Sequence, residues 1–290
     1  MQAVSRRSFL ETSAAATALA LCSQTCRANA GDGMAYGLVT YLWGQDWDLA
    51  TLIANCEAAG ALGVELRTTH AHGVEPTLDD KQRAAVRDRF ADSEVTLVGI
   101  GSNERFDDPN PDVVKKAIEA SKEFIRLSHD VGSTGVKVKP DRFHPDVPRE
   151  KTIEQIGKSL NELGKYADGF GQQIRLEVHG QCAELPTIKA IMDIADHPNV
   201  AVCWNSNAQD LQGAGLEHNL ELVRNRFGAT CHVRELDSPD YPYQQLINLL
   251  VKSNYDGWIL LESSSKPADK VAALTQQVAL FREMVKKAQG

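Results

Sequence analysis

The chain has 290 residues and a formal net charge of −8 at pH 7, with 39 Asp and Glu against 31 Lys and Arg. An acidic chain repels phosphate backbones, so this charge excludes nucleic acid as an expected partner. Beyond the N-terminal segment, no stretch approaches the roughly 20 consecutive apolar residues that a membrane-spanning helix needs. We therefore expect no membrane association once that segment is removed. The rest of the chain suffices for one large domain with a substantial core.

The first 30 residues are typical of an export signal. Residues 5–10 read Ser-Arg-Arg-Ser-Phe-Leu, an Ala- and Leu-rich stretch follows, and residues 28–30 read Ala-Asn-Ala. Paired arginines, a short apolar region and a small-x-small cleavage site are the parts of a twin-arginine signal peptide. We expect residues 1–30 to be removed on export and residues 31–290 to form one domain in the periplasm or otherwise outside the cytoplasm.

Short apolar runs alternate with helical patterns from residue 36 onward. One such pattern contains Val113, Ala117, Ile118 and Ile125 on one helix face. The runs recur about every 32 residues, the size of a βα unit. Eight units predict a single (β/α)8 TIM barrel. A doubly wound open sheet is the alternative, but residues 43–47 lack the glycine-rich phosphate turn that such a sheet carries after its first strand. The runs begin near Tyr36, Gly63, Val95, Gly135, Ile174, Val200, Ala229 and Gly257.

Four of these runs carry a polar residue near their end: Glu177, Asn205, His232 and Glu262. A buried parallel strand is normally a nearly continuous run of Val, Ile and Leu. A charge inside it is costly unless it is paired or bound to a metal. Because barrel enzymes place their sites where the carboxyl ends of the strands meet, we predict that these four side chains converge on one metal ion.

Strand alternation predicts which other side chains point into the barrel. If Glu177 points inward, so do Arg175 and His179, while Leu176 faces the helices. The same parity applied to the neighbouring runs gives a polar interior toward the carboxyl ends of the strands. The predicted inward residues there are Glu65, Arg67, Lys137, Lys139, Cys203, Asn207 and Arg234. Alternation puts Cys203 and Cys231 on opposite faces, so we expect Cys56, Cys182, Cys203 and Cys231 to be buried free thiols.

Several motifs resemble those of the xylose isomerase-like barrel superfamily, which contains sugar isomerases and epimerases. Residues 176–180 (Leu-Glu-Val-His-Gly) are similar to the family's Leu-Glu-x-His on strand five. Residues 232–235 (His-Val-Arg-Glu) are similar to its His-x-Lys-Asp, and residues 257–262 to its closing Gly-x-apolar-Glu. Residues 63–67 are similar to its strand two. The resemblance covers residues 36–288 and implies the same barrel.

The resemblance implies a divalent metal, Mn, Zn, Mg or Co, held by Glu177, Asn205, His232 and Glu262. Such an ion acts as a Lewis acid toward a sugar carbonyl. Glu177 and Glu262 would then be the catalytic carboxylates that remove and return the proton beside the carbonyl. We expect Trp43 or Trp204 to stack on a sugar face. The expected substrate-binding residues are Glu65, Arg67, Lys137, Lys139, His179, Asn207 and Arg234.

The chain departs from the family on strand six. The family usually carries Asp there with His three residues later, whereas this chain has Asn205 and Ala208. An amide oxygen can still bind a metal but supplies no charge, so this departure weakens the expected site. Where the family has Lys-Asp on strand seven, this chain has Arg234-Glu235.

Other interpretations of the same residues remain open. Each Glu could pair with a neighbouring Lys or Arg, and His232 could be a structural histidine. A keto-sugar or cyclitol dehydratase or lyase would need the same metal and carboxylates. A non-catalytic sugar-binding barrel would explain Asn205. A DNA endonuclease would require more His ligands and a basic surface. The sequence leaves the exact substrate and the oligomeric state open, a homo-oligomer included.

Overall fold

The computed structural model describes residues 33–290, so the expected signal peptide lies outside the described residues. Eight parallel strands form a closed barrel in chain order, which confirms the predicted single (β/α)8 fold and rules out the open sheet. Each strand begins within two residues of its predicted start. The strands are β1 Ala35–Val39, β2 Gly63–Arg67, β3 Thr96–Arg105, β4 Gly135–Lys139, β5 Gln173–Glu177, β6 Val200–Asn205, β7 Phe227–Val233 and β8 Trp258–Leu261.

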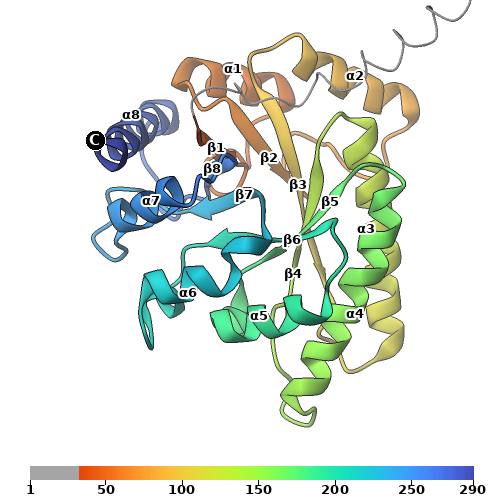
Figure 1. Cartoon of the computed structure of the whole chain (residues 1–290). Coiled ribbons are helices and arrows are strands. Elements are labelled where there is room, and N and C mark those ends of the chain that lie inside the picture. The colour runs from red at the N-terminus through yellow and green to blue at the C-terminus, as the bar shows by residue number, and fades with distance from the viewer. Residues whose placement is uncertain (1–32) are drawn as a thin grey trace, which may run out of the picture. The chain divides into compact units, whose positions relative to one another are not determined.

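Eight α-helices surround the strands (Figure 1). Three short 3-10 helices, η1 Gly180–Cys182, η2 Ala208–Leu211 and η3 Arg224–Arg226, lie in the loops between β5 and β7. Among residues 33–290 no helix is long and apolar enough to cross a membrane. The α-helices are α1 Leu49–Ala59, α2 Asp80–Ala91, α3 Pro111–Asp130, α4 Arg149–Asp168, α5 Leu185–Ile194, α6 Leu216–Val223, α7 Tyr243–Lys252 and α8 Lys270–Gln289.

Capping residues in the sequence set several of the helix starts. Asp79 accepts from the Gln82 amide before α2, and the Gln82 side chain accepts from the Asp79 amide, which forms a capping box. Asp48 and Asp269 cap α1 and α8 by accepting hydrogen bonds from backbone amides with their carboxylates. Each cap satisfies amide groups that have no partner within the helix, so the βα loops end at defined points above the barrel.

The strands alternate as the parity argument predicts. Residues such as Leu66, Val138, Leu176 and Val233 pack with the helices in the hydrophobic core. The opposite face points into the barrel and carries the buried polar residues. All four cysteines of the described chain are buried and free, as predicted. The buried interior-facing polar side chains are Glu65, Lys137, Arg175, Glu177, Asn205, Thr230 and His232.

Arg175 fills the barrel below the polar cluster. Its guanidinium donates to the Val98 carbonyl and to the Thr134 hydroxyl, at 2.7 Å each. Two glycines of β3 leave space for the large interior side chains. A Cβ at Gly99 would lie 3.0 Å from Oε2 of Glu65 and 3.1 Å from Nη1 of Arg175, and one at Gly101 would lie 2.9 Å from Oε1 of Glu65. These glycines therefore allow a carboxylate and a guanidinium to occupy the interior of the barrel.

Candidate functional site

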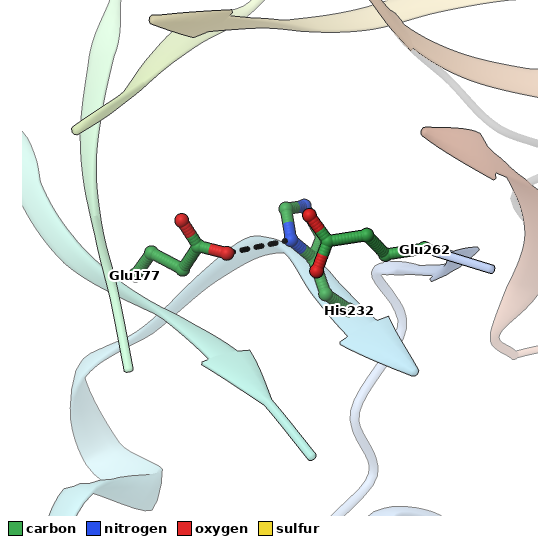
Figure 2. Close-up of side chains that lie close together, drawn as sticks. All are labelled: Glu177, His232 and Glu262. Atoms are coloured by element: carbon green, nitrogen blue, oxygen red, sulfur yellow. Dashed lines mark ion pairs between the residues drawn. The ribbon is translucent and has the colours of Figure 1, made fainter. Parts of the chain in front are cut away.

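Glu177, His232 and Glu262 meet at the carboxyl ends of three strands. Glu177 ends β5, His232 is the penultimate residue of β7, and Glu262 directly follows β8. One ligand atom from each lies within 4.8 Å of the others. Figure 2 shows both glutamates extending toward the imidazole. Two carboxylates and an imidazole at this spacing form the kind of set that holds a divalent metal.

Lys137 fixes one side of Glu177. The Lys137 ammonium donates to Oε2 of Glu177 at 2.8 Å, and the two side chains are 2% and 0% exposed. Burial alone would raise the pKa of Glu177, but the charges of Lys137 and His232 outweigh it and hold that pKa well below its usual value. Glu177 is therefore ionised, with Oε2 bound to Lys137 and Oε1 facing the cluster.

His232 lies between two carboxylates. Its Nδ1 is 3.4 Å from Oε1 of Glu177 and its Nε2 is 3.3 Å from Oε1 of Glu65, although neither contact has hydrogen-bond geometry. Burial lowers the pKa of His232, but the nearby Cys203 and Glu65 groups raise it well above the usual value. A carboxylate behind a ligand imidazole typically fixes the ring and makes it a stronger ligand. Glu65 occupies that position.

Asn205 links the two glutamates through its amide nitrogen. Nδ2 donates to Oε1 of Glu177 at 2.9 Å and to Oε2 of Glu262 at 3.4 Å. The amide oxygen Oδ1 is buried and has no hydrogen-bond partner in the described chain. A half-turn of the amide exchanges the two atoms and points this oxygen at the cluster. With that turn, two carboxylates, an imidazole and an amide oxygen fit a divalent metal ion.

Glu262 is the less constrained of the two glutamates. It is half-buried, whereas Glu177 is completely buried. Within residues 33–290 its only side-chain hydrogen bond is the long contact from Asn205 to Oε2. Oε1 of Glu262 is therefore available to a bound molecule, whereas both oxygens of Glu177 are taken by protein groups.

Arg67 and Lys139 lie above the cluster at the ends of β2 and β4. The Arg67 guanidinium donates to Oδ1 of Asn103 at 3.2 Å, contacts Nε2 of His70 at 3.3 Å and lies over the Tyr41 ring. Burial and the Arg67 charge lower the pKa of His70 to about 4, so the ring is neutral and accepts this contact. Lys139 is half-buried and makes no side-chain hydrogen bond or ion pair within the described chain.

The other residues predicted at the mouth of the barrel are held by protein groups. Nδ1 of His179 lies 3.0 Å from Oδ1 of Asp141, which leaves its Nε2 free. The Asn207 amide donates to the carbonyls of Val178 and Asn205 at 2.7 Å each, so it ties β5 to β6. The Arg234 guanidinium donates to the Glu262 carbonyl at 3.5 Å.

Residues 53–284 match the xylose isomerase-like TIM barrel family. The chain belongs to this family. No curated protein matches it. Among solved structures it is similar to a 3-keto-D-glucoside 4-epimerase from E. coli, with 14% identity, a TM-score of 0.73, and 86% of this chain and 99% of that chain covered.

Two further structures of this fold are similar to the chain. An L-ribulose 3-epimerase has 15% identity and a TM-score of 0.75, with 88% of this chain and 96% of that one covered. The IolI protein with a zinc atom has 15% identity and a TM-score of 0.72, with 88% and 99% covered. At identities of 14–15%, these similarities show that the chain has the same barrel fold as these structures.

Trp43 and Trp204 are not exposed in the mouth of the barrel, although the prediction of sugar stacking requires it. Trp204 is completely buried, packs against Phe227 and belongs to the core between strands and helices. Trp43 is 2% exposed and donates to the Ser265 carbonyl. The prediction that either stacks on a sugar was wrong. Parity alone places Trp204 on the helix side, because its neighbour Asn205 points inward.

Loop residues complete the mouth and were missed at the sequence level. Asp141 contacts His179 and Arg105, and its backbone carbonyl accepts from the amides of Gln181 and Cys182. These contacts join the loop after β4 to the loop after β5. Asp141 has a left-handed φ of 63° and follows Pro140, a turn signal that marks a loop without indicating its partners.

Proposed function

We propose that this protein is a divalent-metal-dependent sugar isomerase or epimerase. The observation that carries the proposal is the convergence of Glu177, His232 and Glu262 within 4.8 Å at the carboxyl mouth of a family barrel. Two similar structures are named as sugar epimerases and a third carries zinc, which supports the same assignment.

The metal would be held by Glu177 through Oε1, by Glu262, by the His232 imidazole and by the Asn205 amide oxygen. When bound, Mn, Zn, Mg or Co would polarise the sugar carbonyl as a Lewis acid. Lys137 keeps Oε2 of Glu177 occupied, so this glutamate presents one oxygen to the cluster. Glu65 contacts the far nitrogen of His232, so we assign it to orienting the ring instead of to binding the sugar.

Glu262 is the group we assign to proton removal, because within the described chain one of its oxygens accepts no hydrogen bond. Its carboxylate takes the proton from the carbon beside the carbonyl, and the C–H electron pair moves toward the carbonyl oxygen. Return of a proton to the neighbouring carbon gives an isomer, and return to the opposite face of the same carbon gives an epimer. Both oxygens of Glu177 are engaged, Oε2 by Lys137 and Oε1 by the cluster, so we assign Glu177 to holding the metal and Glu262 to the proton transfer.

The sugar would lie above the cluster, between β2, β4 and β7. Arg67, Lys139, His179 and Arg234 surround this space and can donate hydrogen bonds to sugar oxygens. Asn207 donates to two backbone carbonyls, so its role is to fix the strand ends. We further propose a periplasmic or otherwise exported location, which the twin-arginine pattern of residues 5–10 supports.

Proton exchange tests the function without knowledge of the natural substrate. Aldoses, ketoses and keto-sugars are incubated with the protein and Mn²⁺ in deuterium oxide and followed by NMR. We expect deuterium at the carbon beside the carbonyl and a new isomer or epimer. Glu262→Gln should reduce the rate by about 10²- to 10⁴-fold. Loss of water from the product would indicate a dehydratase instead.

A non-catalytic sugar-binding barrel is the second candidate. The ammonium of Lys137 and the Asn205 amide already neutralise and bridge the glutamates without an added ion. This function predicts sugar binding with no metal uptake and no deuterium incorporation. Metal titration of the purified chain separates the two functions.

A further inference from the structure

Within residues 33–290, two cations on one wall of the barrel mouth form no ion pair with a carboxylate. Lys137, at 2% exposure, is paired with Glu177, but Lys139, two residues further along β4, is half-buried and forms no ion pair within the described chain. Arg67 at the end of β2 likewise contacts only neutral groups of the described residues, Asn103, His70 and the Tyr41 ring. A buried charge is costly unless it is paired or bound to a ligand, and water solvates these half-buried cations only in part.

The carboxylates of the site form their close contacts with other groups. Glu177 is bound to Lys137, and Glu65 and Glu177 flank His232. A divalent ion in the cluster would add positive charge and engage Glu262 as well. Within the described chain neither Arg67 nor Lys139 forms an ion pair with these carboxylates, and Glu177 and Glu262 act on Lys139 only at longer range.

The two cations face the same space. β3 lies between β2 and β4, and its Gly101 pairs in register with both Arg67 and Lys137. Burial and then the charge of Lys137 lower the pKa of Lys139, with Arg67 adding to the shift and Glu177 and Glu262 opposing it, as expected for groups around one space. Arg67 is held in place by its neutral contacts and retains unused N–H donors. A positive wall in a chain of net charge −8 focuses anions into the mouth.

We infer that the substrate carries an anionic group, a carboxylate or a phosphate, that binds between Arg67 and Lys139. The inference rests on the proposed function for the orientation of the sugar. The anionic end lies over β2 to β4, and the carbonyl end faces Glu262 beyond β8. Uronic acids and sugar phosphates are the two substrate classes with this chemistry.

Calorimetric titration with D-glucose, D-glucuronate and D-glucose 6-phosphate tests the inference. We expect at least one anionic probe to bind about tenfold or more tightly than glucose, as a charge-assisted contact implies. Lys139→Met should abolish that preference, so that the anionic probes bind no more tightly than glucose does to the same variant. Lys139→Arg should retain it, and Lys116→Met, on the exposed face of α3, should behave as wild type. Preference for glucuronate or for the phosphate identifies which anion is bound.

Equal binding of all three probes, or an anion preference that survives Lys139→Met, would overturn the inference. The titrations are run on chelator-treated and Mn²⁺-loaded protein and require no turnover. Anion binding that depends on Lys139 but is accompanied by no deuterium exchange on any sugar would leave this inference standing and refute the proposed function. Deuterium exchange on neutral sugars without any anion preference would support the proposed function and refute this inference.

Discussion

The ammonium of Lys137 lies 2.8 Å from Oε2 of Glu177, and both groups are closed off from solvent. This contact distinguishes the two glutamates of the cluster. Glu177 is ionised and fixed by Lys137, whereas Glu262 is half-buried and accepts a hydrogen bond on only one oxygen within the described chain. A fixed carboxylate suits a metal ligand, and a more mobile one suits proton transfer. The contact with Lys137 therefore favours Glu177 as the metal ligand and Glu262 as the proton-transfer group.

Lys137→Met should destabilise the fold strongly. Removing one partner of a buried ion pair leaves an uncompensated charge, which costs about 3–5 kcal/mol of unfolding free energy. Urea unfolding monitored by circular dichroism measures this loss. The double variant Lys137→Met with Glu177→Gln should recover part of it. Lys139→Met is the matched control, because Lys139 lies on the same strand without a partner. Similar losses for the two single variants would show that the pair adds no stability.

Asn205→Asp should raise metal affinity and lower stability without metal. The carboxylate adds a charged ligand but also places a third negative group beside Glu177 and Glu262. We expect Mn²⁺ and Zn²⁺ to bind about tenfold or more tightly, by analogy with the strength of charged over neutral contacts. Glu262→Gln and His232→Ala should each weaken binding. Calorimetric titration and the metal-induced rise in melting temperature provide the two readouts. Unchanged affinity in all three variants would place the metal elsewhere or exclude it.

Because of Asp210, the free energy of unfolding should fall as the pH rises from about 4 to 7. Asp210 is buried, its Oδ2 accepts from the Tyr241 hydroxyl and from the Asn207 backbone N–H, and burial raises its pKa to about 7. In this pH range the unfolded chain has released the proton and the folded chain still holds it, so unfolding becomes easier as pH rises.

Asp210→Asn keeps an acceptor for both donors but cannot ionise. We expect the variant to lose the decline and to be more stable than wild type at pH 8, on the order of 2 kcal/mol. Urea unfolding at pH 4, 6 and 8 follows the difference. Parallel curves for the two proteins would show that Asp210 ionises normally in the fold.

The barrel could be predicted from the sequence because its pattern repeats. Eight apolar runs at even spacing specify the closed sheet, and period-two alternation specifies which side chains enter it. The same alternation is why residues as far apart as Lys137, Glu177 and His232 could be expected inside one barrel before any contact was known.

Which inward residues contact one another could not be predicted. Parity places Glu65 and Lys137 inside but does not give their height along the barrel or their partners. Glu65 lies beneath His232 because Gly99 and Gly101 leave room beside it. Loop contacts such as that between Asp141 and His179 depend on backbone turns that have no periodic signal.

The twin-arginine prediction concerns residues outside the described range. Replacing Arg6 and Arg7 with Lys should block export, because the pathway recognises the arginine pair. Cell fractionation with antibody detection should find the variant in the cytoplasm and the native chain outside it. The single variant Arg27→Lys, near the expected cleavage site, should be exported. Export of the double variant would refute the signal assignment.

Glu65→Gln separates two roles for a carboxylate that the sequence assigned to sugar binding. Glu65 is completely buried, and its Oε1 lies 3.3 Å from Nε2 of His232. Burial raises the pKa of Glu65, but the charges of His232, Lys137 and Arg175 lower it overall, so the group is ionised. An ionised carboxylate behind a ligand imidazole raises its basicity. The substitution should therefore weaken metal binding by about 10- to 100-fold, measured by titration with Zn²⁺ and Mn²⁺.

Measuring the sugar affinity of Glu65→Gln tests the alternative role, in which Glu65 binds the sugar. If Glu65 only orients His232, the variant should bind sugar in the absence of metal as wild type does, because the carboxylate has no exposed surface with which to reach a ligand. Glu283→Gln, on the exposed face of α8, controls for the loss of one negative charge and should change neither affinity. Weakened sugar binding with intact metal affinity would return Glu65 to the substrate site. Loss of metal affinity alone would place it behind the imidazole, one layer below the reacting sugar.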